Sequence, residues 1–421
     1  MSVTSTNYSG EQNTFITPDI VAREALMILE ANIIAPQVMN TSAAAEWAGS
    51  KIGDTVRVRR PAFFGVDDYT RTSGGSETIK IQDAVETSVD LKIEHHYDVS
   101  FEVSSKELSL SVDDFNTRLL KPAMSSLSQK IDKYALTKIG DLGGMAETAD
   151  FTAPNSLADV SAVVEKMNRQ KIPQQGRKMI VSPTMQTQIY SIDNFVQAQM
   201  SGDNTSPVRD ALLGRFMGMD MLMALELPSH TVGAYLVSAT DNAWAITAAH
   251  TEGTTTISLD GASGSGTAAT AIGDTLRITY VDGFTRDHKV TNVVANSSGA
   301  FASVGISPGL YGVDAAAVDG ASPNVVANDA VCTLVGGNAS VTSYTLGAAF
   351  VPDAFQLVFV PQPAPMGPGT SAATVSYNGM SLRVLQTFDH TKKRDLISVD
   401  CMVGAAAIDA RLGCRVPSTA G

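Results

Sequence analysis

Residues Val112 to Gly140 read VDDFNTRLLKPAMSSLSQKIDKYALTKIG, a segment with the period of a long α-helix. Its large apolar residues recur at steps of four, three, four and three, and so share one helix face. These residues are Leu120, Met124, Leu127, Ile131 and Tyr134. The opposite face is polar and carries Ser125, Ser126, Gln129, Lys130, Asp132 and Lys133. Pro122 lies inside the segment, so either the helix is kinked there or the main helix begins near Lys121 after a shorter one. The pattern predicts a spine helix against which sheets and loops pack.

A second helix is predicted from Thr17-Pro18-Asp19, because proline in a first turn followed by an acidic residue is a strong start signal. It ends before Pro36. Its expected apolar face comprises Ile20, Val21, Ala25, Ile28, Leu29 and Ile33. Such a stripe needs another surface to bury it, either in the same chain or in a neighbouring copy.

Two segments with the period of β-strands come next, Lys51 to Phe64 and Thr78 to Ser104, separated by polar, turn-rich residues. We interpret them as an extended two-stranded arm. An isolated hairpin is marginally stable in water, so the arm implies a partner surface. The arm is locally basic, which suits either a solvated strand face or ion pairs with a neighbouring subunit. The interface candidates here are Arg57, Arg59, Arg60 and Arg71.

Helix and strand signals alternate from Ser156, the expected N-cap of a helix, to about Pro228, with Pro183 starting another helix. Between Ser229 and Thr345 the composition changes, because these 117 residues carry nine acidic and three basic side chains and almost no helical period. Short β-type runs separated by turns such as Asp282-Gly283 predict a separate small β-barrel or sandwich. Strands are predicted again at Phe355 to Val360, Met380 to Asp389 and Leu396 to Met402.

The length of 421 residues is typical of two to three domains. The composition, with 44% hydrophobic and 17% charged residues, is that of a folded protein. A net charge of −13 argues against sequence-specific nucleic-acid recognition, which needs clustered basic residues, but leaves weak contact with packaged nucleic acid open. The cysteines Cys332, Cys401 and Cys414 are too few and scattered for a disulfide framework or a zinc site. With no signal peptide and no run of 18 apolar residues, we expect neither export nor a membrane anchor.

Two stretches near the C-terminus resemble the coat proteins of tailed double-stranded DNA phages, the Hong Kong 97-like capsid fold. They are LGAAFVPDAFQLVFVPQP (Leu346 to Pro363) and SLRVLQTFDHTKKRDLISVDCMVGAAAIDARLGCRV (Ser381 to Val416). The likeness is greatest to the coat proteins of short-tailed Salmonella-type phages, which carry an inserted β-barrel domain. About 55 residues are recognisably similar in amino-acid sequence, whereas the order of the parts matches over nearly the whole chain.

This resemblance implies an α+β capsid fold of five parts. They are an N-terminal arm at 1–50, an extended loop at 51–104, a peripheral domain with the spine helix at 105–154 and 371–421, an axial domain at 155–228 and 346–370, and an inserted β-barrel domain at 229–345.

The implied function is that of a major capsid protein, assembled in the host bacterial cytoplasm and located in the virion. Copies would form the hexamers and pentamers of an icosahedral shell around the phage genome. The implied partners are further copies, a scaffolding protein, a portal protein and non-specifically packaged double-stranded DNA, with a decoration protein left open. A bacterial nanocompartment shell on the same fold and a β-rich adhesin or carbohydrate-binding module are the alternatives.

The sequence has no Walker loop and no HExxH, CxxC or GxSxG motif. We therefore expect that the chain is not an enzyme and binds no cofactor. Gly264-Ser265-Gly266 imitates a dinucleotide fingerprint but has no helix after it. Asp67-Asp68 and Asp113-Asp114 suit turn and cap roles better than cation binding, and His95 and His96 should point to opposite faces of a strand.

Two further features concern subunit contacts. The basic turn Lys392-Lys393-Arg394 is an interface candidate, and Lys80 is the obvious lysine for the inter-subunit cross-link that some capsids of this fold form.

Overall fold

The structure is a computed structural model with a strand-rich α+β fold. It describes residues 18–42, 55–60, 88–104, 116–146, 154–192, 214–231, 243–260, 272–295, 301–311, 324–335, 343–365, 370–389, 391 and 394–419. The two sheets and the barrel that follow are built from these ranges.

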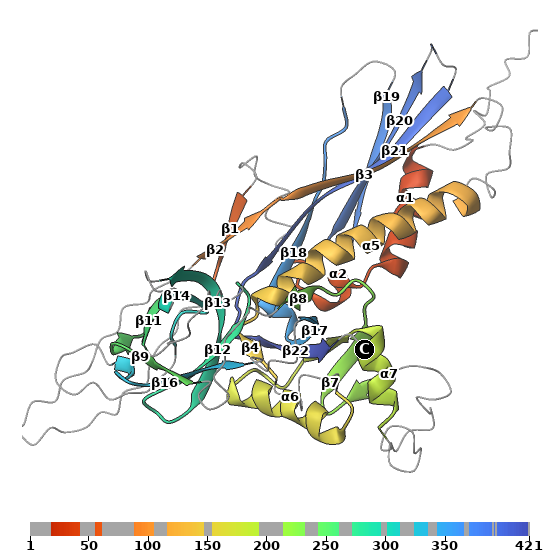
Figure 1. Ribbon diagram of the computed structural model, residues 1–421. Coiled ribbons are helices and arrows are strands. Elements are labelled where there is room, and N and C mark those ends of the chain that lie inside the picture. Colours follow the sequence, from red (N-terminus) through yellow and green to blue (C-terminus); the bar gives the residue numbers. More distant parts are fainter. Residues whose placement is uncertain are drawn as a thin grey trace, which may run out of the picture.

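A five-stranded sheet with two helices on one face forms the first unit (Figure 1). Strand β21 lies in its middle, with β3 along one side and β20 and then β18 along the other. Strand β19 pairs with β20 at the outer edge. Helix α5 packs against β3 and β21, and α1 packs against β19, β20 and α5. The bounds are β3 His95–Ser104, β18 Phe355–Val360, β19 Thr370–Tyr377, β20 Met380–Asp389, β21 Arg394–Ala407, α1 Pro18–Asn32 and α5 Lys121–Thr137.

The spine helix has the predicted apolar face. All five apolar residues from Leu120 to Tyr134 are buried in the core between helix and sheet. Of the two alternatives at Pro122, the second is confirmed, because a π-helical turn at Asn116–Leu120 precedes α5 and Pro122 lies in the first turn of α5. A 3₁₀ turn at Lys138–Asp141 continues the helix. Asp132 was expected on the polar face, but its side chain is buried, because it binds backbone groups of the segment after α1.

Helix α1 begins at Pro18 as predicted, and its stripe is buried within the same chain. Val21, Ala25, Leu29 and Ile33 of the predicted face are buried, so most of that face is confirmed, but its centre is shifted. Ile20 is 48% exposed, whereas Ala22 and Leu26 are buried, because α1 packs against both α5 and the sheet. A short helix α2, Ala35–Val38, follows after a two-residue turn. Residues 18–40 therefore pack on the body instead of extending from it.

A seven-stranded mixed sheet forms the second unit, in the order β4-β22-β17-β5-β7-β6 with β8 beside β17. Helices α6 and α7 pack into its core. Ser156 is the N-cap of α6, as predicted, and it also forms a capping box with Asp159. Helix α7 begins at Pro183, as predicted. The bounds are β4 Gly144–Met145, β5 Lys178–Val181, β6 Arg215–Phe216, β7 Met219–Met223, β8 Ser229–Thr231, β17 Ser343–Phe350, β22 Gly413–Thr419, α6 Leu157–Arg169 and α7 Pro183–Tyr190, with a 3₁₀ turn at Pro352–Ala354.

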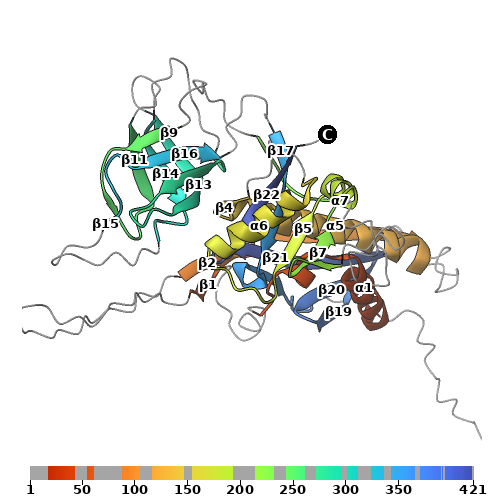
Figure 2. The ribbon, with the colours of Figure 1, turned by 90° about the horizontal axis from the view of Figure 1, so that it is seen from below.

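The region of short β-type runs contains a closed barrel, in the strand order β11-β14-β13-β12-β16-β9. Figure 2 shows it as a lobe beside the two sheets. It has its own apolar core, and the predicted turn Asp282-Gly283 joins two of its strands. The bounds are β9 Ala243–Ile246, β11 Thr256–Asp260, β12 Thr275–Thr279, β13 Thr285–Ala295, β14 Phe301–Ser307 and β16 Val331–Val335, with a separate pair β10 His250–Thr251 and β15 Asn324–Val326.

The sheets divide the chain differently from the expected boundaries at several strands. β4 was expected in the peripheral part, but it pairs with β22 in the seven-stranded sheet. β18 was expected in the axial part, but it pairs with β21 in the five-stranded sheet. β22 was expected in the peripheral part, but it pairs with β17 in the seven-stranded sheet. β8, at the start of the expected barrel range, also pairs with β17. The sheet to which a strand belongs depends on the strand with which it pairs. The hydrophobic pattern of one strand does not reveal its partner.

Candidate subunit interface

The arm is present as a two-stranded antiparallel ribbon of β1 (Thr55–Arg59) and β2 (Ser88–Lys92), and within the described residues it forms a sheet of its own. Arg57 lies directly opposite Asp90, and its Nε is 3.2 Å from the Asp90 carboxylate. Both side chains are exposed, so this ion pair adds little stability. Arg59 is exposed as well, whereas Arg71 lies outside the described residues. The arm thus presents arginine side chains to solvent.

The base of the arm crosses closely over the five-stranded sheet. Leu91 on β2 is fully buried against Val358 on β18. A Cβ atom added to Gly404 on β21 would lie 2.5 Å from the Lys92 carbonyl oxygen, so only glycine permits this approach. Arg60 turns inward beside Asp409 and Arg411. Burial lowers the pKa of Arg60, and the Asp409 carboxylate opposes that shift.

The predicted continuous strand from Thr78 to Ser104 is divided at Ile93 and Glu94, and its second half, β3, pairs with β21 in the main sheet. Residues 78–87 of this segment lie outside the described residues. The division occurs where Glu94 is bound by the spine helix. Tyr134 Oη donates a 2.7 Å hydrogen bond to Glu94 and accepts one of 3.1 Å from the Ala405 N–H, and Lys138 Nζ lies 3.0 Å from Glu94. The Tyr134 hydrogen bond lowers the pKa of Glu94. These contacts fix the point at which the arm leaves the body.

The basic turn between β20 and β21 is described only at Arg394, because Lys392 and Lys393 lie outside the described residues. Arg394 Nη1 is 2.6 Å from Glu102 on β3, an exposed pair within one chain. His95 and His96 point to opposite faces as expected. His95 stacks on Tyr97, whereas His96 Nε2 is 2.9 Å from Asp400 on the other face.

A buried network of charges joins the barrel to the seven-stranded sheet. Asp287 on β13 is 1% exposed, and its carboxylate lies 2.5 Å from Lys166 Nζ on α6 and 2.8 Å from Arg277 Nε. It also accepts a 3.2 Å hydrogen bond from the Met145 N–H. Burial alone would raise the pKa of Asp287, but the charges of Lys166 and Arg277 outweigh burial and hold the pKa below its usual value.

Arg415 on β22 is a second buried connection to the barrel. It is fully buried and donates hydrogen bonds of 2.6 Å to the Gly273 carbonyl oxygen and 2.5 Å to Thr275 Oγ1. His230 Nε2, on β8, lies 2.7 Å from the buried Asp274. A shift of the barrel would break these directional contacts of Arg415 and His230, so they hold the barrel in one position on the body.

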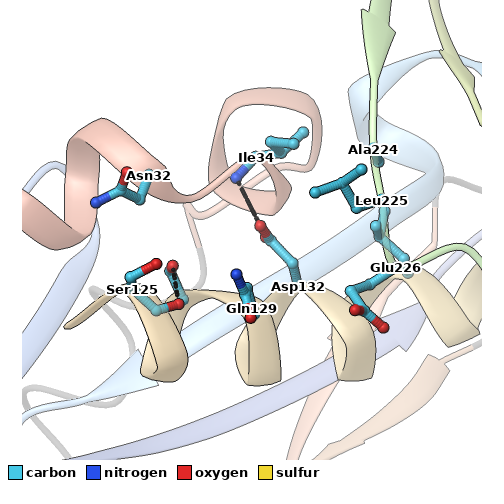
Figure 3. A pocket seen from close by; sticks show the side chains of 10 residues that line it. Asn32, Ile34, Ser125, Gln129, Asp132, Ala224, Leu225 and Glu226 are labelled. Atoms are coloured by element: carbon cyan, nitrogen blue, oxygen red, sulfur yellow. Dashed lines mark hydrogen bonds between the residues drawn. The ribbon is translucent and has the colours of Figure 1, made fainter. Parts of the chain in front are cut away.

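A pocket of about 210 Å³ lies between α5, the turn after α1 and the loop after β7 (Figure 3). Figure 3 shows Asp132 extending from α5 toward the backbone of Ile34. The Asp132 carboxylate accepts hydrogen bonds from the N–H groups of Ile34, at 3.1 Å, and Ala35, at 2.8 Å. Burial raises the pKa of Asp132 to about 6, although these two hydrogen bonds oppose the shift. Asp132 therefore ties the α1–α2 turn to the spine helix.

Comparison with known proteins gave matches among solved structures only, since no family model and no curated protein matches the chain. A chain of Mycobacterium phage Che8 is 12% identical, with 91% of this chain and 90% of that chain covered and a TM-score of 0.46. The mature capsid of bacteriophage PhiM1 is 9% identical, with 87% and 82% covered and a TM-score of 0.41. The capsid of Cyanophage P-SCSP1u is 9% identical, with 88% and 85% covered and a TM-score of 0.42. At TM-scores below 0.5 this likeness decides neither fold nor function.

The remaining residues considered for cross-linking, cation binding, cofactor binding or thiol chemistry fall into two groups. Lys80, Asp67-Asp68, Asp113-Asp114 and Gly264-Ser265-Gly266 lie outside the described residues. The three cysteines are buried, and burial raises the pKa of each thiol to about 12. The described ranges hold no group of three or more His, Cys, Asp or Glu side chains placed to bind a metal ion. Within the same ranges, no helix is both long and apolar enough to span a bilayer.

Sequence reasoning missed the residues that hold the parts together, namely Asp132, Lys166, Asp287 and Arg415. Arg277 and Asp287 are recognisable as two of the few charges in an otherwise uncharged region, which is the one available signal. Lys166 on α6, the partner of Asp287, lies 121 residues away, so no local pattern connects the two.

Proposed function

We propose that this chain is a major capsid protein that self-assembles into an icosahedral shell enclosing a phage double-stranded DNA genome. The observation that carries the proposal is the ribbon β1–β2, which is anchored at its base by Leu91 and Gly404 and pairs only with itself among the described residues. Two-stranded ribbons need a further surface for stability. In a shell, neighbouring copies supply that surface.

The charge distribution supports contacts between copies. The chain carries a net charge of −13, yet the ribbon exposes Arg57 and Arg59. A basic ribbon on an acidic body can form ion pairs with the body of the next copy. The rigid attachment of the barrel by Asp287 and Arg415 suits a building block, because repeated contacts need one fixed shape.

Under this proposal the parts have the roles implied by the sequence resemblance. The ribbon belongs to the extended loop, the five-stranded sheet with α5 to the peripheral domain, the seven-stranded sheet to the axial domain, and the barrel is an insertion that steadies subunits. The chain acts as a structural protein and not as an enzyme. Scaffolding and portal proteins and non-specifically packaged DNA are its proposed partners, and the virion is its proposed location.

Co-expression with the scaffolding protein, followed by sedimentation and cryo-electron microscopy, tests the proposal. We expect closed particles of several megadaltons. Reversing two ribbon charges, Arg57→Glu with Arg59→Glu, should reduce the particle yield at least tenfold. Arg23→Glu is the matched control, because Arg23 is an exposed arginine on α1. Monomers or small oligomers alone, under every condition, would overturn the proposal.

A nanocompartment shell built on the same fold is the second candidate. The barrel, which has its own core, favours the phage shell, because the phage coat proteins that the sequence resembles carry an inserted β-barrel domain. The contents of the purified particles discriminate between the two: packaged DNA supports the phage shell, and an enclosed enzyme supports the nanocompartment.

A further inference from the structure

Strand β19 forms an outer edge of the five-stranded sheet, and among the described residues it pairs only with β20. Asn378 and Gly379 form the two-residue turn between them, and both have positive φ, as a type I′ turn requires. The pair Tyr377–Met380 flanks this turn and is therefore a hydrogen-bonded pair. Since such pairs alternate along the ladder, the N–H and C=O groups of residues 370, 372, 374 and 376 point away from the sheet.

The sequence of this edge lacks the charges and prolines that often prevent strand pairing. Its sequence, TSAATVSY, contains no charged residue and no proline over eight residues. The opposite edge strand, β3, carries Asp98 and Glu102. Natural sheets usually protect exposed edges with charges, prolines or bulges, so an unprotected edge indicates that another strand covers it in the functional state.

Burial across the register supports the same conclusion. Ala373 lies opposite Val384, and Val375 lies opposite Leu382. Both β20 residues are 1% exposed, whereas Ala373 and Val375 are only half-buried although they contact the same core. A strand added beside β19 would complete the burial of these two side chains.

We propose that β19 of a second copy of this chain pairs with β19 in antiparallel orientation about a twofold axis. The inference deepens the proposed function and rests on it, because a shell places many copies at high local concentration. Identical strands related by a twofold axis form a self-complementary contact. In β19 that contact brings no like charges together, whereas pairing of β3 with itself would oppose carboxylates. The two sheets then become one continuous sheet across the axis.

Thr374 provides a charge test, because its backbone faces the partner strand. Its hydroxyl donates a 2.9 Å hydrogen bond to the Gln362 carbonyl oxygen, which both charged variants remove alike. Thr374→Lys and Thr374→Glu each place like charges across the axis, so each variant alone should lose at least tenfold in particle yield. Mixing the two variants should restore the yield, because the charges are then opposite. Circular dichroism and thermal melting check that both subunits are folded.

A disulfide test reads the same contact directly. Cysteine at Ala373 or Thr374 covers the two central twofold registers, and one of them should give covalent dimers under mild oxidation. The native cysteines do not interfere, because all three are buried. Ser100→Cys, on the opposite edge strand, is the control and should give no dimer.

The outcomes separate the two proposals. If the wild-type chain forms closed particles but neither cysteine variant forms dimers and charge mixing restores nothing, the β19 inference is wrong and the proposed function stands. Loss of yield in both charged variants without rescue or dimers would show that β19 does not pair with itself, which also overturns the inference. If no particles form, the proposed function fails, and cross-linking of the concentrated subunit still decides whether β19 pairs with itself.

Discussion

The ammonium group of Lys166 lies 2.5 Å from the carboxylate of Asp287, and this contact joins a helix of the seven-stranded sheet to a strand of the barrel. The two residues are 121 positions apart, and Asp287 is almost completely buried. Burial of an ion pair adds little net stability, but removal of one partner leaves a charge buried without compensation. The position of the barrel therefore depends on both residues.

Asp287→Asn should loosen the barrel. The variant leaves Lys166 and Arg277 without their carboxylate, and we expect a loss of about 3–5 kcal/mol in the free energy of unfolding. Urea unfolding monitored by tryptophan fluorescence measures the effect, since Trp244 packs against the barrel core. Asp90→Asn removes the exposed partner of Arg57 and should cost less than about 1 kcal/mol. Equal midpoints for the two variants would show that Asp287 does not anchor the barrel.

Local patterns in the sequence were sufficient for elements whose signal lies within one segment. The apolar face of α5, the start of α1, the N-cap Ser156 and the short strands of the barrel follow from periodicity, proline position and capping chemistry. These signals depend on neighbours within a few residues, so one chain without homologues reveals them.

Long-range partners decide the features that sequence patterns misplaced. Asp132 has the helical position of a solvated residue, but the α1–α2 turn packs over it and buries it. Strand β19 was not predicted, because small and hydroxylated residues in TSAATVSY give weak alternation. The strand β3 was assigned to the arm, because its alternation is the same whether it pairs with a ribbon or with β21.

Gly404→Ala should displace the base of the arm. The added Cβ would lie 2.5 Å from the Lys92 carbonyl oxygen, and a backbone atom cannot give way without moving β2. We expect a lower melting temperature and faster proteolysis of the arm. Gly140→Ala is the matched control, because a Cβ there meets no atom within 4 Å. The close crossing would be disproved by a Gly404→Ala protein that melts and resists protease like the control.

Tyr134→Phe should weaken the attachment of the segment between β2 and β3 to the spine helix. It removes the hydrogen bond to Glu94 and leaves the Ala405 N–H without an acceptor. A buried unpaired donor costs about 1–3 kcal/mol, which chemical denaturation can resolve. Tyr377→Phe is the control at an exposed tyrosine and should change stability by less than about 0.5 kcal/mol. A shift as small as that of the control would rule out this role.

Asp132→Asn should change the pH dependence of stability. Burial raises the pKa of Asp132 from 3.8 to about 6, so between these values the folded state binds more protons than the unfolded state. The contribution of Asp132 is therefore most favourable below pH 4, and it is lost as the pH rises through 6. A difference of about two pKa units corresponds to roughly 3 kcal/mol. Asparagine keeps an oxygen acceptor for the Ala35 N–H but does not titrate.

Unfolding free energies measured from pH 4 to pH 7 test this sign. The stability of Asp132→Asn relative to wild type should rise across that interval and stay constant above about pH 7, because Asp132 is then fully ionised. Asp132→Ala is the control at the same site. It also abolishes titration but leaves the Ile34 and Ala35 N–H groups unpaired, so its curve should lie about 1–3 kcal/mol below that of Asp132→Asn at every pH. Parallel curves for wild type and Asp132→Asn would show that the carboxylate titrates alike in the folded and unfolded states, and that its burial does not destabilise the ionised form.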